Sequence, residues 1–278
     1  MADLKISPDL CASVAGLWDS LQVNEDDLHS DNFQDSFRSE VIECIGDAWA
    51  ELLRAIGAEL ASAPYTVVIR GAEVDMADKI LSTLAACIGR MTNPYRGIVP
   101  GMSLLQEIFA KGPASPDRVW LWHTDSANWQ RPNDYSAFAC VRAAPVGGAT
   151  ETLCLDTVSR SARVANVSLA RLANDSFPWP VERVLGGGVV YEPVISSERL
   201  RFRRELLLSS AESSYWDVVS EFSELIDGMS PDATSLLKPG DMLIFDNRKV
   251  MHRSGPVTDP QGNRLLLRTK INARSVTQ

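Results

Sequence analysis

The feature that most constrains the fold is a change in sequence texture near Met102. Before it, apolar residues recur at three- and four-residue steps, which predicts amphipathic helices over Phe37–Ala61 and Ala77–Met91, with a short strand at Tyr65–Gly71 between them. After it, short apolar segments are separated by glycine, proline, asparagine and aspartate. Many short strands divided by such turns are typical of a β-sandwich or jelly roll.

The strands predicted after this change share short length and flanking turn residues. They lie at Ser103–Phe109, Val119–Asp125, Tyr135–Ala143, Thr150–Asp156, Gly188–Val194, Met242–Asp246 and Leu265–Asn272. One late helix is expected over Asp217–Asp227. Helices followed by a β core predict a single α+β domain over residues 1–278, with a helical part at 1–64 and a jelly-roll core at 65–278 that carries an insert at about 157–235.

The charge and cysteine content exclude several classes of protein. The chain has 278 residues and a net charge of −9, and no lysine- or arginine-rich run of the kind that grips nucleic acid is present. The short basic cluster Arg199–Arg204 is interpreted as a solvated edge. Five cysteines without a CxxC pair are typical of free thiols in a reducing compartment. No signal peptide or apolar span is visible, so we expect a cytoplasmic protein with no membrane partner.

Only three histidines occur, and two of them have informative neighbours. His29 lies in an acidic segment and is expected at the surface. His123 and Asp125 are two residues apart in a predicted strand, so their side chains share a face and could offer a nitrogen and an oxygen to one metal ion. The two tryptophans that directly precede this segment, Trp120 and Trp122, are expected to exclude water.

The third histidine follows a turn and a buried strand. Pro239-Gly240-Asp241 is a turn signal, Met242–Asp246 is the strand, and His252 comes shortly after it. Two histidines and one carboxylate form the facial triad of non-haem iron(II) oxygenases. Three protein ligands leave three positions of an octahedral ion open, which suits a bidentate 2-oxo acid and O₂.

A buried 2-oxo diacid also needs a cation for its distal carboxylate, because an unpaired buried carboxylate is costly. An arginine can pair with it through two parallel hydrogen bonds. Arg264 and Arg268 lie in a strand that is expected to return toward the strand of His252. Either arginine could instead end in solvent.

Together these residues resemble the clavaminate synthase-like and taurine dioxygenase-like Fe(II)/2-oxoglutarate-dependent oxygenases. The resemblance rests on His123-Thr124-Asp125, Pro145–Thr150, Gly240–His252 and the two arginines, and it covers roughly residues 65–275. It implies a double-stranded β-helix fold, with His123, Asp125 and His252 binding iron. Thr150 and Arg264 would hold 2-oxoglutarate, and Arg268 would match a second family arginine that contacts substrate or co-substrate. Related halogenases replace the acid with a small residue, so the presence of Asp125 argues against halogenation.

The resemblance implies an enzyme that uses Fe(II), 2-oxoglutarate and O₂ to hydroxylate a small molecule, with release of succinate and CO₂. Desaturation, epoxidation or cyclisation at the same site stay open, as do a zinc hydrolase and a non-enzymatic jelly-roll binding protein. Substrates of this branch are commonly amino acids or natural-product intermediates, so we expect an amino-acid-derived small molecule. The acidic surface favours an uncharged, zwitterionic or cationic one.

Overall fold

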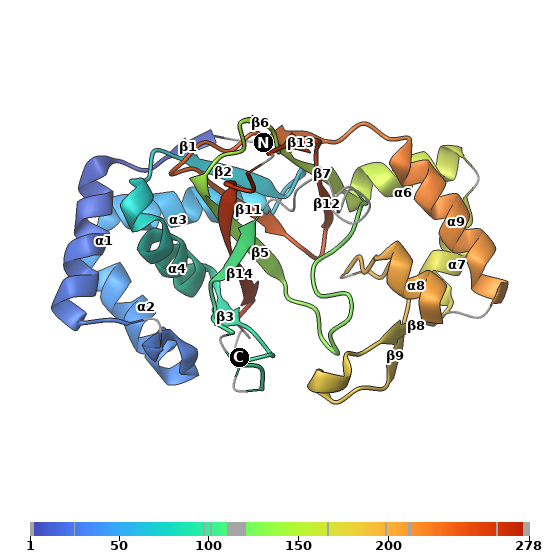
Figure 1. The fold of residues 1–278 in the computed structure, drawn as a ribbon, viewed down its shortest axis with the longest axis horizontal. Coiled ribbons are helices and arrows are strands. Elements are labelled where there is room, and N and C mark those ends of the chain that lie inside the picture. The colour runs from blue at the N-terminus through green and yellow to red at the C-terminus, as the bar shows by residue number, and fades with distance from the viewer. Residues whose placement is uncertain are drawn as a thin grey trace.

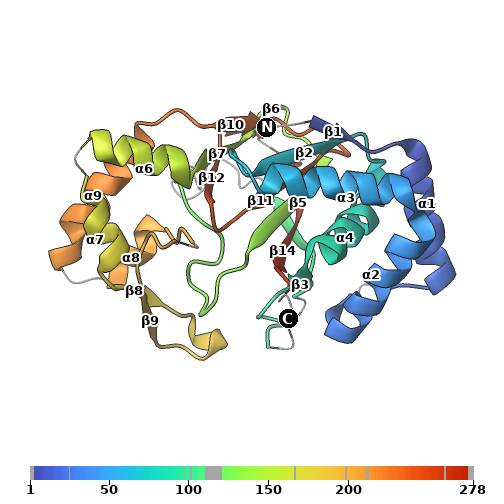
Figure 2. The same cartoon turned by 180° about the vertical axis from the view of Figure 1, so that it is seen from behind.

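The structure is a computed structural model that describes residues 3–24, 26–96, 98–100, 102–109, 121–165, 167–197, 199–210, 213–259 and 261–274. Two β-sheets lie at the centre, and helices pack on either side of them (Figure 1). The view from behind shows the same arrangement, with α3 and α4 lying against the larger sheet (Figure 2). The predicted α+β jelly-roll class is confirmed.

The larger sheet has the strand order β1-β2-β11-β5-β14-β3, and β4 also pairs with β14. Its strands are β1 (Asp3–Lys5), β2 (Thr66–Arg70), β3 (Arg90–Thr92), β4 (Gln106–Phe109), β5 (Tyr135–Arg142), β11 (Met242–Asp246) and β14 (Leu265–Asn272). All of its pairs are antiparallel except β1 with β2, which the sequence pattern did not predict.

The smaller sheet has the order β10-β7-β12, from Ala233–Ser235, Thr150–Cys154 and Val250–Ser254. Two separate pairs join β6 (Val146–Gly147) to β13 (Val257–Thr258) and β8 (Phe177–Pro180) to β9 (Val189–Glu192). One buried cluster takes residues from both sheets, so it fills the space between them: Val68, Phe138, Cys140, Cys154, Leu237, Leu243, Phe245, Val250 and Leu266.

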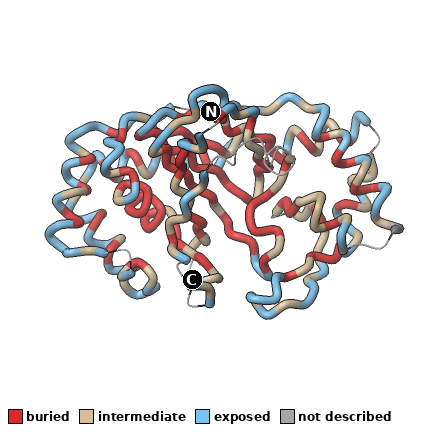
Figure 3. The backbone as a smooth tube through the Cα atoms, viewed as in Figure 1, coloured by how far each residue is buried: buried red, intermediate tan, exposed pale blue. Residues whose placement is uncertain are grey.

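The helices cover the outer faces of the two sheets and bury their apolar sides there. The larger sheet carries α1 (Pro8–Leu21), α2 (Asp31–Ile45), α3 (Asp47–Leu60) and α4 (Ala77–Ile88), whose buried residues form one cluster with the sheet. On the other side lie α6 (Leu155–Val164), α7 (Leu169–Asn174), α8 (Arg204–Ser210) and α9 (Ser213–Asp227), with a second cluster of their own. Figure 3 shows that burial is concentrated in the strands and on the inward sides of these helices.

Alternation along the strands separates an outer from an inner face of the larger sheet. On β14, Leu267 and Ile271 pack into the cluster under the helices. Leu266 packs into the cluster between the sheets. Arg268 and Lys270, two and four residues later, lie on the same face of the strand as Leu266. The inner face of β14 therefore brings two cations between the sheets.

Three sequence predictions differ from the structure. The helix expected over Phe37–Ala61 is two helices, because Gly46 takes a φ of +81°, in the left-handed region, and breaks the chain direction. The described part of the Val119–Asp125 segment forms only an isolated bridge at His123, and Val119 and Trp120 lie outside the described residues. The strand of Arg268, β14, which Arg264 directly precedes, pairs with β5, β3 and β4 of the larger sheet and not with the strand of His252.

Other predicted elements are confirmed with small shifts of their ends, among them β2, α4, β5, β7, β9, β11 and α9. In the described part of the chain no helix has the length and apolar character that a bilayer crossing requires. All five cysteines are free thiols, and only Cys44 is exposed. The single-domain division and the cytoplasmic location stay predictions.

Candidate metal centre

The backbone brings the first and last histidines of the predicted triad side by side. His123 and His252 form an antiparallel bridge with reciprocal N–H to carbonyl hydrogen bonds of 3.1 and 2.9 Å. The rings of directly paired residues are neighbours, and here their centroids lie 4.3 Å apart. The strand β12 thus positions His252, and the segment that pairs with it positions His123.

Asp125 completes this group. One donor atom each from His123, Asp125 and His252 lies within 4.8 Å of the other two, a spacing that suits a shared metal ion. His123 Nδ1 lies 2.9 Å from the Leu121 carbonyl, which can only accept, so this ring nitrogen donates. Its Nε2 is then left with the lone pair that a metal requires. The donor set of two imidazoles and a carboxylate fits ferrous iron.

Burial sets the protonation state of the two histidines. It lowers the pKa of His123, against the opposing attraction of Asp125. Burial, together with the neighbouring His123, lowers the pKa of His252 to about 3. Both imidazoles are therefore neutral near pH 7, which is the form that binds a metal. His252 Nδ1 has no hydrogen-bond partner in the described part of the chain.

Asp125 is a buried carboxylate held at both oxygens. Ser136 Oγ donates to Oδ2 at 2.7 Å, and Arg268 Nη1 lies 3.1 Å from Oδ1. Burial alone would raise the pKa of Asp125, but Arg268, His252 and Lys270 lower it well below its ordinary range. Asp125 is consequently ionised, and since each oxygen has two lone pairs, one stays open to a cation.

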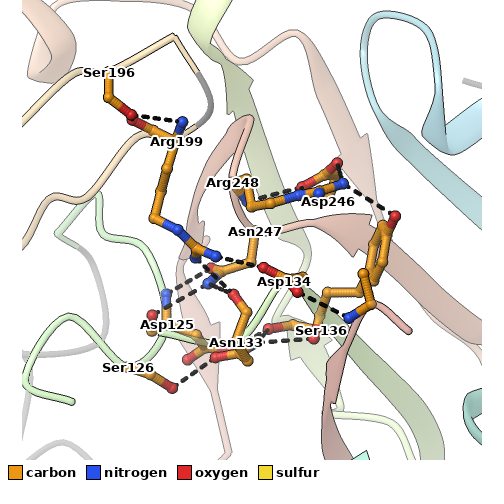
Figure 4. Close-up of polar contacts among 12 residues, drawn as sticks. Asp125, Ser126, Asn133, Asp134, Ser136, Ser196, Arg199, Asp246, Asn247 and Arg248 are labelled. Carbon is orange, nitrogen blue, oxygen red and sulfur yellow. Dashed lines mark hydrogen bonds and ion pairs between the residues drawn. The ribbon is translucent and has the colours of Figure 1, made fainter. Parts of the chain in front are cut away.

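A polar network fixes the backbone around Asp125 (Figure 4). The Asn247 side chain accepts from the Asp125 N–H at 2.8 Å and donates to the Asp125 and Asn133 carbonyls at 3.2 and 2.9 Å. Asn133 in turn donates to Ser136 Oγ at 3.0 Å and accepts from Ser126 Oγ at 2.6 Å. Asn247 is fully buried in the turn between β11 and β12, so it links the two strand ends to the acid.

Aromatic rings enclose His252, but the predicted tryptophans do not contribute to them. The ring of His252 lies 4.8 Å from that of Phe245 and 6.1 Å from that of Phe138. Trp122 points instead into the cluster under α6–α9, where Arg253 lies over its ring at 4.3 Å. The expectation that Trp122 excludes water from the site is wrong, and Trp120 lies outside the described residues.

Arg264 has the surroundings expected of a 2-oxoglutarate ligand. It is 7% exposed, and its Nη2 donates to the Gly148 carbonyl at 3.1 Å. In the described chain no carboxylate lies within ion-pair distance of the Arg264 guanidinium. The nearby Asp259 carboxylate accepts a hydrogen bond from the backbone N–H of Arg264 and not from its side chain. Burial lowers the pKa of Arg264. A buried guanidinium that lacks an acid fits the distal carboxylate of a dicarboxylic acid.

The Gly147-Gly148 turn explains how this arginine is seated. Gly148 takes a φ of +77°, and a Cβ there would lie 3.2 Å from Arg264 Nε. Thr150, the predicted threonine, is buried two residues later on β7. The structure thus brings Arg264 to the Gly147-Gly148 turn that directly precedes the strand of Thr150.

Arg268 occupies a different place. Its Nη1 contacts Asp125, and its Nη2 donates to Gln106 Oε1 at 2.7 Å. Its Nε is enclosed and has no partner in the described chain. Because Arg268 already has an acid partner and Arg264 has none, the geometry favours Arg264 as the 2-oxoglutarate ligand. Both roles stay predictions.

The basic cluster Arg199–Arg204 is not simply a solvated edge, so that interpretation is wrong for two of its members. Arg199 pairs with Asp134 and donates to the Asn133 carbonyl at 3.0 Å. Arg201 is 1% exposed and donates to the carbonyls of Ala127 and Trp129 at 2.7 to 3.1 Å. These arginines hold the loop that follows Asp125.

His29 also differs from expectation. Its side chain is only 5% exposed and lies 3.7 Å from Asp26, away from the other two histidines. It plays no part in the cluster.

Sequence reasoning missed four polar residues of the site. Ser136, Thr152, Asn247 and Lys270 are all buried. Thr152 pairs with His252 in register, and its hydroxyl has no partner in the described chain. A polar residue in an otherwise apolar strand was the available signal, as for Ser136 between Tyr135 and the apolar run Ala137–Val141.

Comparison with known proteins adds a family-model match to part of the chain and a fold. A family model described as taurine catabolism dioxygenase TauD, TfdA family, matches residues 46–159. No curated protein matches the chain in sequence. A solved structure of asparagine oxygenase with Fe(II), 2S,3S-3-hydroxyasparagine and succinate is similar, with a TM-score of 0.76 and 16% identity over 98% of this chain and 94% of that one. The non-haem iron oxygenase OrfP with Fe, succinate and (3R,4R)-dihydroxy-L-Arg gives a TM-score of 0.73 and 16% identity over 99% and 94%.

These findings confirm the resemblance that the motifs predicted. The chain is TauD-like in sequence over residues 46–159, and over nearly its whole length it has the fold of non-haem iron oxygenases.

Proposed function

We propose that this protein is a non-haem Fe(II)/2-oxoglutarate-dependent dioxygenase that hydroxylates an amino-acid-derived small molecule. The observation that carries the proposal is the combination of the His123/Asp125/His252 cluster with a buried guanidinium, that of Arg264, that has no acid partner in the described chain. A zinc hydrolase or a binding protein would not need the second feature. The similar structures bind hydroxylated asparagine or arginine together with succinate, which supports an amino-acid substrate.

The proposed division of roles follows from the geometry. His123, Asp125 and His252 hold the iron, and Arg264 with Thr150 holds 2-oxoglutarate. When bound, these two groups supply the oxidising power, with O₂ consumed and succinate and CO₂ released. Ser136 and Arg268 fix the orientation of the Asp125 carboxylate, and the rings of Phe138 and Phe245 keep water from His252.

The test is an anaerobic titration of the protein with Fe(II) and 2-oxoglutarate. A 2-oxo acid chelated to ferrous iron gives a weak visible charge-transfer band, which should appear in the wild type and be lost in His252→Ala. A folded wild-type protein that shows no band would overturn the proposal. Succinate release in a screen of amino acids then identifies the substrate.

A further inference from the structure

Lys270 is a buried cation without a polar partner. The residue is 7% exposed, and in the described part of the chain its ammonium makes no hydrogen bond or ion pair. Lysines are almost never buried unless they are paired. A partner is therefore missing at this position.

The strand register places Lys270 beside the candidate metal centre. It lies directly opposite Ser136 on β5, and Ser136 donates to Asp125. Arg268, two residues earlier on the same face of β14, contacts the other oxygen of Asp125. Side chains opposite one another on one face of a sheet have Cβ atoms about 5 Å apart. The ammonium of Lys270 thus belongs to the space around the predicted iron.

One wall of this space is the ring of Trp129. Lys270 Nζ lies 4.0 Å from the ring centroid. The ring Nε1 donates to the Tyr95 hydroxyl at 3.1 Å, and the backbone carbonyl of Trp129 accepts from Arg201 at 2.7 Å, so both the ring and the backbone of Trp129 are held. A rigid aromatic wall beside a cation is a suitable surface for the body of a small ligand.

The ring and Asp125 explain why a lysine is tolerated here, but they do not satisfy it. A cation–π contact leaves the three N–H donors of the ammonium unused. Asp125 is already shared by Ser136 and Arg268, and it is a predicted iron ligand. Burial lowers the pKa of Lys270 to about 7, against the attraction of Asp125. An anion bound beside the ammonium would restore its charge.

The charges of the loaded site favour such an anion. A ferrous ion and a 2-oxoglutarate dianion cancel each other, and Asp125 offsets only one of the three cations Arg264, Arg268 and Lys270. Two positive charges remain in excess, since the more distant Arg203 and Glu182 act on Lys270 in opposite directions. The enclosed Nε of Arg268 is also unpaired in the described chain. We propose, on the basis of the function proposed above, that Lys270 and Trp129 form the subsite for an anionic group of the substrate. The substrate is then an acidic amino acid or a close derivative. This departs from the neutral or cationic substrate that the surface charge favoured.

The test uses the anaerobic protein with Fe(II) and 2-oxoglutarate bound, and it measures binding through the shift of the visible band. The probes are two isosteric pairs, L-glutamate with L-glutamine and L-aspartate with L-asparagine. The wild type should bind the acid of at least one pair about 10-fold more tightly than its amide, since hydrogen bonds to charged groups are stronger than neutral ones. Lys270→Met, which keeps the length and the packing on Trp129, should lower the acid's affinity to that of the amide.

Two further variants control for the change of charge and for folding. Lys270→Arg should keep the preference for the acid. Lys79→Met removes a lysine on α4 that pairs with Asp19 outside the site, and it should change nothing. Tighter binding of the amides by the wild type, a preference that survives in Lys270→Met, or a band that none of the four probes shifts would overturn the inference. Absence of the band itself would instead contradict the proposed function.

Discussion

The two faces of the larger sheet differ sharply although the same strands build both. On the outer face, Ala137, Ala139, Met242 and Ile244 pack under α1–α4 in an apolar cluster. On the inner face, Ser136, Arg268 and Lys270 stand among aromatic and aliphatic side chains and surround a buried carboxylate. The outer face can therefore contribute mainly to stability, while the inner face retains polar atoms whose proposed partners are a metal ion and small molecules. Substitutions on the two faces should separate these contributions.

The largest effect is expected at a proposed metal ligand on β12 of the smaller sheet, close to the inner face of the larger sheet. His252→Ala removes one of three ligands, so Fe(II) affinity and succinate release should fall by more than about 100-fold, because loss of a supporting group alone costs 10- to 100-fold. Thermal unfolding of the metal-free protein should stay cooperative. Unchanged turnover would show that His252 is not a ligand.

On the outer face the expected loss is one of stability. Ile244 is fully buried under the helices, so Ile244→Ala should lower the free energy of unfolding by about 2–5 kcal/mol through lost burial and a residual cavity. Chemical denaturation measures this loss. Fe(II) affinity at a temperature where the variant is folded should match that of the wild type, and a marked drop would mean that the two faces are coupled.

Arg264→Ala should separate co-substrate binding from metal binding. Loss of two charge-assisted hydrogen bonds should weaken 2-oxoglutarate binding by about 100-fold, while Fe(II) affinity stays within a few-fold. Competition titrations with the visible band give both values. Arg268→Ala is the matched variant: if it alone weakens 2-oxoglutarate binding, the assignment of the two arginines must be exchanged.

A smaller effect is expected at Ser136. Ser136→Ala removes the hydroxyl that orients the Asp125 carboxylate, so Fe(II) affinity should fall by about 10-fold with little change in stability. Ser82 on α4 offers a matched control, because its buried hydroxyl has no partner in the described chain. Ser82→Ala should leave iron binding unchanged. An equal loss of Fe(II) affinity in both variants would show that the Ser136 hydroxyl does not act by orienting the Asp125 carboxylate.

Most secondary-structure elements could be predicted because they depend on local patterns. The short segments of β5 and β14 between turn residues and the helical repeat in α4 and α9 are visible in the sequence. The break at Gly46 was also visible in principle, since a glycine inside a helical repeat is a common point of interruption. The edge strand β1 was not, because three residues form a strand only when β2 lies beside them.

The sequence by itself determined the candidate ligands, since histidine is rare here and two of three lie in motifs with the right neighbours. The spacing of short strands also determined a β-sandwich or jelly-roll class, and the resemblance to the oxygenase family narrowed this to the jelly roll. Only the tertiary structure decided which arginine lacks an acid, that Ser136 and Asn247 hold Asp125, and that Lys270 faces the site. The physical reason is that a side chain's partners depend on strand pairing and register. Apart from the contact of Ser136 with Asp125, they arise between segments more than 100 residues apart, which no local pattern records.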